Sequence, residues 1–189
     1  LFPRASGRGI GRAMQLRPAT LEDVPALAHL GRGSFTSAFG HLYRPEDLTA
    51  FLGEVHDERA VASEIAGAEC HHRLAVGEDG ALLGYCKLRH PSKLAGLSGA
   101  ANPLELAQLY CAGGATGRGV GAALIEWALA EARRGGHDAV QLSVYSGNRG
   151  AQRFYARYGF ARTADTQFKV GEQLDDEYLY EKPLPGEHA

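Results

Sequence analysis

A glycine-rich loop joins a strand-like segment to a helix-like segment in the second half of the chain. Residues 105–111, Glu-Leu-Ala-Gln-Leu-Tyr-Cys, read as a strand, and residues 112–121 read Ala-Gly-Gly-Ala-Thr-Gly-Arg-Gly-Val-Gly. An amphipathic run follows and continues to Arg134. Glycines let the main chain approach a phosphate, and the N–H groups in the first turn of a helix have no partner within the helix. The order of strand, glycine loop and helix therefore indicates a site for an anion.

The loop by itself does not identify the anion. Residues 117–121, Gly-Arg-Gly-Val-Gly, lack the Gly-Lys-Ser/Thr ending of a nucleotide P-loop. They also lack the full Gly-x-Gly-x-x-Gly spacing of a dinucleotide site, because Ala122 stands three positions after Gly119. A turn that only begins a helix fits these residues equally well.

Hydrophobic periodicity and turn residues predict one domain in which strands and helices are mixed. The expected strands cover residues 15–17, 73–77, 81–89, 106–111, 139–144, 160–170 and 177–184. The expected helices cover residues 20–30, 45–52 and 57–68, the run after the glycine loop to residue 134, and a last helix that begins at Asn148. Residues 90–103 contain Gly, Ser and Pro without a period and are expected to form a loop.

Three short motifs follow one another at characteristic separations. They are Leu109-Tyr-Cys111, the loop Thr116-Gly-Arg-Gly-Val-Gly121, and Asn148-x-x-Ala151-x-x-Phe154-Tyr155-x-x-x-Gly159-Phe160. Together they resemble the GNAT superfamily of acyl-CoA N-acetyltransferases, over residues 14–184. The resemblance implies a single α/β domain with a mixed, mainly antiparallel central sheet flanked by helices, and acetyl-CoA as cosubstrate without a metal. The chain departs from the family at Thr116, where Gln or Arg is usual, and this leaves the affinity for the cofactor open.

The resemblance also implies which residues hold the cofactor. The main-chain amides of the loop would bind the pyrophosphate, and these belong to Gly117, Arg118, Gly119, Val120, Gly121 and Ala122. Leu109 and Cys111 would pair their main chain with the pantetheine arm, and the Cys111 N–H would polarise the thioester oxygen. Asn148 would bond the same arm, although a plain helix N-cap explains this residue equally well.

Two side chains are candidates for the proton transfers. Tyr155 is the candidate general acid for the departing thiolate, and the alternative is an aromatic residue that only packs in the core. Glu105 lies where the histone acetyltransferases of the superfamily carry a catalytic glutamate, so it is the candidate general base. A strand-end carboxylate without a role, or a base supplied by a chain of water molecules, remains open. His72 and His90 are further candidate bases.

Features outside these motifs resemble bacterial spermidine/spermine-type acetyltransferases and favour a polyamine-like acceptor. These features are residues 33–40, 43–48, 84–88 and 168–172. Carboxylates that suit such an acceptor are Glu46, Asp47, Glu54, Asp57 and the acidic run 175–177, although each is also explained as a solvated surface group. A protein α-amine, an amino acid or an aminoglycoside remains open as the acceptor, and so does a sensor that binds acetyl-CoA without turnover. The closing strands suggest a homodimer.

Composition restricts the setting and the partners. The chain has 189 residues and a net charge of −2, so a general affinity for nucleic acid or anionic membranes is not expected. Cys70, Cys86 and Cys111 have no metal-site spacing, and no apolar run is long enough to span a membrane. Residues 1–13 are basic without an apolar segment, so we expect a flexible N-terminal extension, a catalytic domain over 14–184, a tail over 185–189 and a cytoplasmic location.

Overall fold

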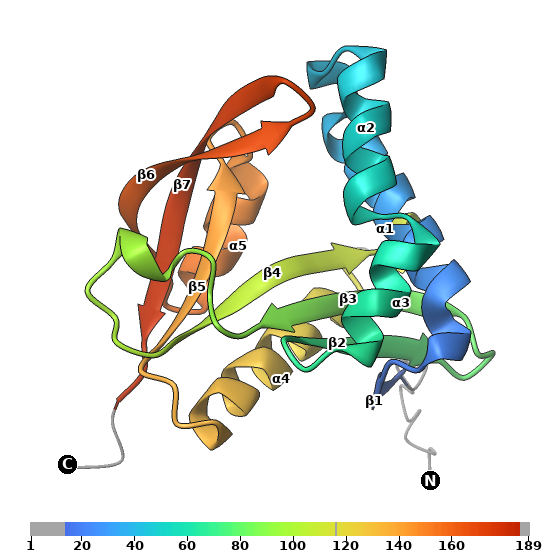
Figure 1. The fold of residues 1–189 in the computed structure, drawn as a ribbon. Coiled ribbons are helices and arrows are strands. Elements are labelled where there is room, and N and C mark those ends of the chain that lie inside the picture. The colour runs from blue at the N-terminus through green and yellow to red at the C-terminus, as the bar shows by residue number, and fades with distance from the viewer. Residues whose placement is uncertain (1–13, 116, 186–189) are drawn as a thin grey trace, which may run out of the picture.

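The computed structural model describes residues 14–115 and 117–185, and these form one sheet with helices on both of its faces (Figure 1). The strands follow the order β1-β2-β3-β4-β5-β7-β6. Neighbouring strands are antiparallel except for β4 and β5, which are parallel. This confirms the expected mixed, mainly antiparallel α/β fold. The strands are β1 (Met14–Pro18), β2 (Cys70–Gly77), β3 (Leu82–Arg89), β4 (Pro103–Cys111), β5 (Ala139–Tyr145), β6 (Ala161–Val170) and β7 (Gln173–Pro183). The expectations for residues 1–13, 186–189 and Thr116 lie outside the described residues.

The sheet opens between its two parallel strands. β4 and β5 pair over only three positions, from Pro103 opposite Ala139 to Glu105 opposite Gln141. Beyond this point β4 stays paired with β3, and β5 stays paired with β7. The two halves of the sheet therefore diverge in Figure 1. The second half of β4 presents N–H and C=O groups that the sheet does not pair on this side.

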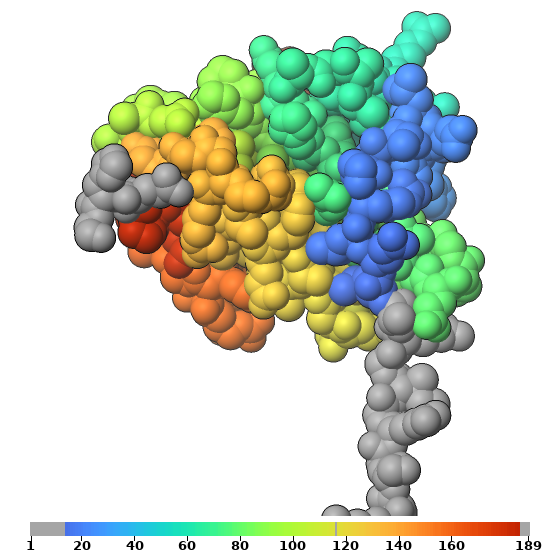
Figure 2. Space-filling view, turned by 90° about the horizontal axis from the view of Figure 1, so that it is seen from below, coloured from blue at the N-terminus to red at the C-terminus, as the bar shows by residue number. Residues whose placement is uncertain are grey.

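Helices cover both faces of the sheet through separate apolar clusters. On one face, α4 (Val120–Arg134) buries Leu124, Ile125 and Ala128 against the central strands, and α5 (Arg149–Arg157) packs beside it. On the other face, α1 (Val24–Phe39) and α3 (Glu58–Ala66) pack against Leu74 and Tyr85. Seen from below in Figure 2, α4 crosses the middle of the first face.

The remaining helix connects the N-terminal region with the last hairpin. α2 (Pro45–Val55) begins at a proline, as expected, and its Phe51 and Leu52 pack with Phe35 of α1 and Val170 of β6. The Asp47 carboxylate of α2 accepts a hydrogen bond from the Glu172 N–H (2.8 Å) at the turn between β6 and β7. This contact places α2 beside the tip of the β6–β7 hairpin, as Figure 1 shows.

The first helix differs from its prediction at the C-terminal end. The apolar stripe in the sequence predicts a helix to about Leu30, but α1 continues to Phe39. A Cβ atom at Gly31 would meet the ring of His56 and the Tyr85 hydroxyl. Close packing against these buried groups therefore explains a glycine inside the helix, where local propensity disfavours it.

Candidate active site

The glycine loop has the main-chain conformation that an anion site requires. Gly117 and Gly119 adopt φ values of 77° and 82°, a left-handed region that favours glycine. Gly119 is the N-cap of α4, and the first hydrogen bond within the helix runs from the Ala123 N–H to the Gly119 carbonyl (3.0 Å). The amides of residues 120–122 therefore have no acceptor within the helix. No described atom lies within 4 Å of a Cβ built at Gly117 or Gly119, so the surface above the loop is open.

A large cavity connects the loop with the open edge of β4. Its volume is about 870 Å³, and its wall includes Leu109, Cys111, Ala112 and Gly113 on one side and α1 on the other. The cavity thus reaches the two β4 residues that the sequence assigned to the cofactor and the first residues of the glycine loop, whereas residues 117–122 do not line it. Burial raises the pKa of the Cys111 thiol above its ordinary value.

Asn148 stands where this cavity meets a second one. Its side-chain oxygen accepts a hydrogen bond from the Ala151 N–H (3.0 Å), so it is the N-cap of α5. The same residue lines both cavities. The N-cap interpretation is thus confirmed, and a contact with the cofactor arm stays a prediction.

The second cavity lies in the opening between β4 and β5. Its volume is about 250 Å³, and it shares five lining residues with the first, namely Ser34, Ala38, Leu109, Tyr110 and Asn148. Tyr155 of α5 lines it from one side, and Phe35, Phe39 and Phe168 line it from the side of α1 and the hairpin. The cavity therefore passes through the sheet, and the two faces supply different side chains to it.

Tyr155, the candidate general acid, lines this cavity, and its role as proton donor stays a prediction. Its hydroxyl makes no hydrogen bond to any group in the described part of the chain. Burial first, and then the neighbouring Tyr110, Cys86 and Cys111, raise the pKa of Tyr155 above its ordinary value of 10. The hydroxyl is consequently protonated at neutral pH, as a general acid must be before it acts.

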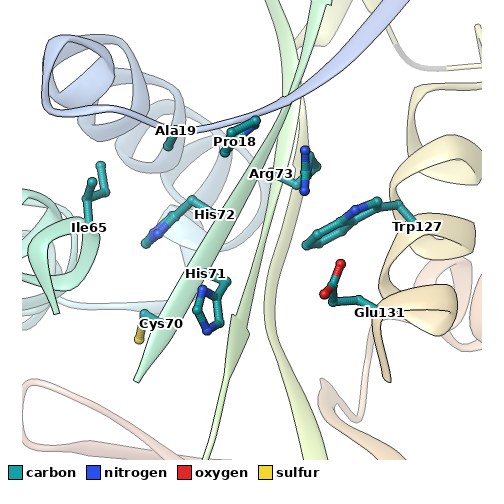
Figure 3. A pocket seen from close by; sticks show the side chains of 9 residues that line it. All are labelled: Pro18, Ala19, Ile65, Cys70, His71, His72, Arg73, Trp127 and Glu131. Carbon is teal, nitrogen blue, oxygen red and sulfur yellow. The ribbon is translucent and has the colours of Figure 1, made fainter. Parts of the chain in front are cut away.

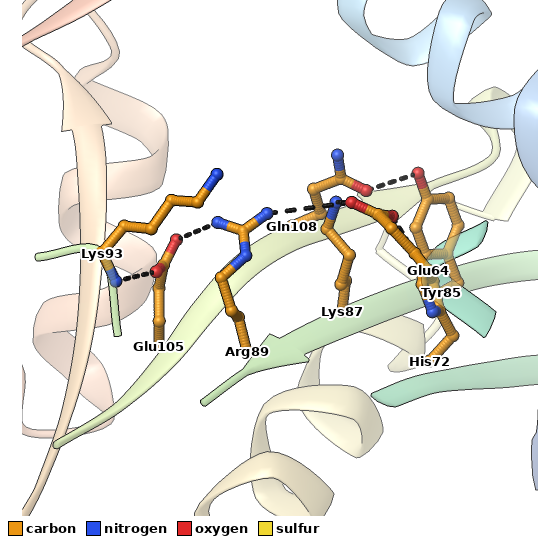
Figure 4. Close-up of polar contacts among 8 residues, drawn as sticks. All are labelled: Glu64, His72, Tyr85, Lys87, Arg89, Lys93, Glu105 and Gln108. Atoms are coloured by element: carbon orange, nitrogen blue, oxygen red, sulfur yellow. Dashed lines mark hydrogen bonds and ion pairs between the residues drawn. The ribbon is translucent and has the colours of Figure 1, made fainter. Parts of the chain in front are cut away.

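Glu105 lies at the closed end of the opening and not along the cavity wall. It is buried, and it belongs to the last paired position of β4 and β5. One carboxylate oxygen accepts a hydrogen bond from an Arg89 guanidinium N–H (2.9 Å), and the other accepts one from the Lys93 main-chain N–H (2.8 Å). Figure 4 shows both contacts. Any proton that this ion-paired carboxylate took from an acceptor amine would have to reach it through water.

The charged cluster of Figure 4 continues from Glu105 toward α3. Glu64 of α3 accepts a hydrogen bond from the Lys87 ammonium (2.7 Å) and lies 3.5 Å from His72 Nε2. Burial by itself raises the pKa of Glu64, but the hydrogen bonds from His72 and Lys87 outweigh this effect and lower it to about 2. Lys87 is only 1% exposed. His72, one of the further candidate bases, is therefore held by this cluster, away from the cavity between β4 and β5.

The acidic side chains proposed for the acceptor differ in their surroundings. Most are exposed or are engaged within the protein. Glu46, Glu54 and Asp176 are exposed and line neither cavity, Asp47 pairs with Arg44 (2.7 Å), Asp57 caps α3, and Asp175 accepts hydrogen bonds from Tyr43 and Gln173. Glu177 of β7 is the exception, because it lines the cavity between β4 and β5 and its buried Oε2 has no partner among the described residues. The sequence indicated this acidic run but gave no signal that singled out Glu177.

A further hollow at the β1–β2 edge is separate from this site. Figure 3 shows its lining, in which the Arg73 guanidinium lies over the Trp127 ring at 4.4 Å and Cys70 and His71 lie nearby. Its volume is about 160 Å³. Within residues 14–115 and 117–185, no group of three or more His, Cys, Asp or Glu side chains is arranged to hold a metal ion. The same residues include no helix that is long and apolar enough to cross a membrane.

Comparison with known proteins assigns the chain to one enzyme class. The model of the acetyltransferase (GNAT) family matches residues 35–160, which include the opening, the glycine loop and α5. The chain therefore belongs to the acetyltransferase (GNAT) family. This confirms the expected class, an acetyl-CoA-dependent N-acetyltransferase.

The individual relatives agree with this class. An uncharacterized N-acetyltransferase of Lactobacillus delbrueckii subsp. lactis is 29% identical over 86% of this chain and 93% of its own length. An uncharacterized N-acetyltransferase of Mycobacterium tuberculosis H37Rv is also 29% identical, over 87% and 99%. Among solved structures, the PaiA N-acetyltransferase of Thermoplasma acidophilum in complex with coenzyme A matches with a TM-score of 0.74 at 20% identity, over 91% of this chain and 99% of that one. Arabidopsis thaliana NAA60 in complex with acetyl-CoA matches with a TM-score of 0.71 at 18% identity, over 92% and 100%.

Proposed function

We propose that this enzyme transfers the acetyl group of acetyl-CoA to the primary amine of a small molecule, with a polyamine-like acceptor favoured. The observation that carries the proposal is the continuity of three features. The glycine loop, open above Gly117 and Gly119, begins at Ala112 and Gly113 in the wall of a large cavity, and this cavity adjoins the opening in the sheet where Tyr155 lies. A long ligand with a phosphate group at one end and a thioester at the other fits this order of features.

The proposed binding residues follow this path. The amides of residues 117–122 are proposed to bind the pyrophosphate, chiefly those of residues 120–122, which have no acceptor within the helix; the Arg118 N–H already donates to the Ala115 carbonyl (3.2 Å). Leu109 and Cys111 lie on the free edge of β4 and pair with the amide groups of the pantetheine arm. The structures of PaiA and NAA60 with coenzyme A or acetyl-CoA support a cofactor of this kind in the shared fold.

The proposed reaction is a direct transfer within one complex. The amine nitrogen loses a proton and attacks the thioester carbonyl carbon, a carbon–nitrogen bond forms, and the carbon–sulfur bond breaks. The Cys111 N–H is the proposed donor to the carbonyl oxygen, and Tyr155 gives its proton to the departing thiolate. If Glu105, the base suggested by the sequence, took the amine proton, it would do so through water, because its two oxygens are engaged by Arg89 and Lys93.

A polyamine is supported by the sequence resemblance and by the acidic and aromatic residues on the acceptor side of the opening.

A homodimer formed through the edge strand β6 is also proposed, because β6 has only one neighbour in the sheet. Light scattering of the purified protein tests this second point independently.

Thiol release from acetyl-CoA tests the activity. The acceptor panel is spermidine, spermine, lysine, an aminoglycoside and a short peptide, with calorimetric binding of acetyl-CoA measured in parallel. Turnover with one class of amine supports the proposal and identifies the acceptor class. Binding of acetyl-CoA without turnover on any member would instead support a sensor that holds the cofactor.

A further inference from the structure

Glu177 is the one acidic side chain in the lining of the cavity between β4 and β5. It lies on β7 opposite Tyr145 of β5, and its side chain shares a face with Ser143 and Asp175 because alternate strand residues point the same way. This is the face on which Phe39 contacts Tyr145, with ring centroids 6.0 Å apart. Glu177 therefore reaches the cavity from the acceptor side, whereas Tyr155 reaches it from α5.

The Glu177 carboxylate has no cationic partner in this cavity. The described lining contains no Lys, Arg or His, and Glu177 Oε2 is buried without a hydrogen-bond donor. The polar groups around it are Asp175 on the same strand, Ser143 and Tyr145 on β5, Tyr110 on β4, and Tyr43 beyond Asp175. Burial chiefly, and Asp175 in addition, raise the pKa of Glu177, while the Ser143 hydroxyl acts in the opposite direction.

This arrangement contrasts with that of the other carboxylates nearby. Glu105 is paired with Arg89, and Glu64 is paired with Lys87. Glu177 has the Ser143 hydroxyl beside it but no cation in the described lining, and its buried Oε2 loses solvation without gaining a donor, which is unfavourable for the folded protein. A ligand that brings a positive charge into the cavity would remove this penalty.

Starting from the proposed N-acetyltransferase activity, we propose that Glu177 binds the ammonium group of the acceptor in the cavity between β4 and β5 and then takes its proton. One N–H proton moves from the ammonium to the carboxylate, and the neutral amine then attacks the thioester carbon. Base and acid thus act from opposite sides of the opening, with Glu177 on the hairpin side and Tyr155 on the α5 side.

The rest of the lining restricts the chemical class of the acceptor. Phe35, Phe39 and Phe168 form the wall beside Glu177 and suit methylene groups or, by cation–π contact, a second ammonium. A carboxylate next to the reacting amine would meet the Glu177 carboxylate in a site without cations, and like charges repel. We therefore expect alkyl monoamines, diamines and polyamines as acceptors, and we expect free α-amino acids to be excluded.

The test compares Glu177→Gln with two matched variants. Glu105→Gln removes the other candidate base, and Asp176→Asn removes an exposed carboxylate one position away from Glu177. Each protein is assayed by thiol release with n-butylamine, spermidine and glycine over a range of pH, and acetyl-CoA affinity and thermal unfolding are measured. Calorimetric titration of spermidine into the protein saturated with coenzyme A measures acceptor binding without turnover.

The expected result separates binding of the acceptor from binding of acetyl-CoA. Glu177→Gln lowers kcat/KM for both amines by about 10²–10⁴-fold, as loss of a general base does. It also weakens spermidine binding, leaves acetyl-CoA affinity unchanged and does not lower the unfolding temperature at neutral pH. In the wild type, kcat/KM falls as the pH drops through the raised pKa of Glu177, and this limb disappears in Glu177→Gln. Asp176→Asn behaves as the wild type.

Three results would overturn the assignment. They are wild-type kcat/KM in Glu177→Gln, loss of the acidic limb in Glu105→Gln instead, and faster turnover of glycine than of butylamine. If the wild type acetylates none of these amines, the proposed activity fails, and the spermidine titration then decides the role of Glu177. Equal spermidine affinity in wild type and Glu177→Gln would refute it as an ammonium site.

Discussion

Substitution of Gly119 by valine should greatly weaken acetyl-CoA binding while the protein still folds. Gly119 has φ of 82°, where a β-branched residue is strained by about 1–3 kcal/mol. A new Cβ atom meets nothing within 4 Å, so the protein itself presents no clash. At about 2–4 °C per kcal/mol for a chain of this size, the unfolding temperature should fall by about 2–12 °C. We expect the valine side chain to prevent two main-chain amides from reaching the phosphates. Each hydrogen bond to a charged group contributes about 1.5–3 kcal/mol, so the affinity for acetyl-CoA should fall by about 10²–10⁴-fold.

Gly136 provides a matched control at the other end of the same helix. Its φ is 66°, and a Cβ atom there also meets nothing within 4 Å. Gly136→Val should therefore cost a similar amount of stability and leave acetyl-CoA affinity unchanged. Calorimetric titration with acetyl-CoA and thermal unfolding of both variants make the comparison. Wild-type affinity in Gly119→Val, or an equal loss in both variants, would show that the loop at the start of α4 is not the phosphate site.

Three other predictions test separate features. Tyr155→Phe should lower kcat by about 10²-fold or more and leave the affinity for acetyl-CoA unchanged. If steady-state kinetics show an unchanged kcat, Tyr155 only packs in the core and is not the proton donor. Gly31→Ala should destabilise the protein by about 1–3 kcal/mol in urea unfolding, because the methyl group would meet the ring of His56, whereas Gly33→Ala has open space and should not destabilise it. The pKa of Glu64 is lowered to about 2 in the folded state, so its contribution to stability is full above its ordinary value of 4.5 and is lost as the pH falls toward 2. Glu64→Gln should remove this part of the dependence of the free energy of unfolding on pH, and an unchanged curve would contradict the pairing.

Local signals in the sequence were enough to predict the frame of the site. Gly117 and Gly119 adopt left-handed φ values that favour glycine, so the turn at these positions can be predicted from the local sequence alone. The strand before the loop and the helix after it follow from apolar periodicity. The sequence could therefore place the loop, β4 and α4 in order, and the family resemblance connected them with α5.

The environment of each carboxylate depends on contacts between residues that are far apart in the sequence, and the local sequence does not predict these contacts. Glu105 meets Arg89 only because the register of β3 and β4 places the two residues opposite each other. In the acidic run of β7, Asp175 is satisfied by Tyr43, which is far away in the sequence, while Glu177 is left without a donor at Oε2. Three similar residues in a row therefore acquire different chemistry through the tertiary structure alone.

The short pairing between β4 and β5 has a consequence for the stability of the empty enzyme. Along this part of β4 the main-chain N–H and C=O groups that face β5 are unpaired, so the two halves of the sheet are held together less firmly. Unpaired strand edges can also pair with strands of other chains. If the amide groups of acetyl-CoA lie along β4, they would pair with these main-chain groups and connect the two halves of the sheet. We therefore expect acetyl-CoA to slow hydrogen exchange of the β4 amides beyond Glu105 and to raise the unfolding temperature with its concentration. The enzyme would therefore be most rigid with acetyl-CoA bound, and the main-chain groups of β4 would become unpaired again each time the product leaves.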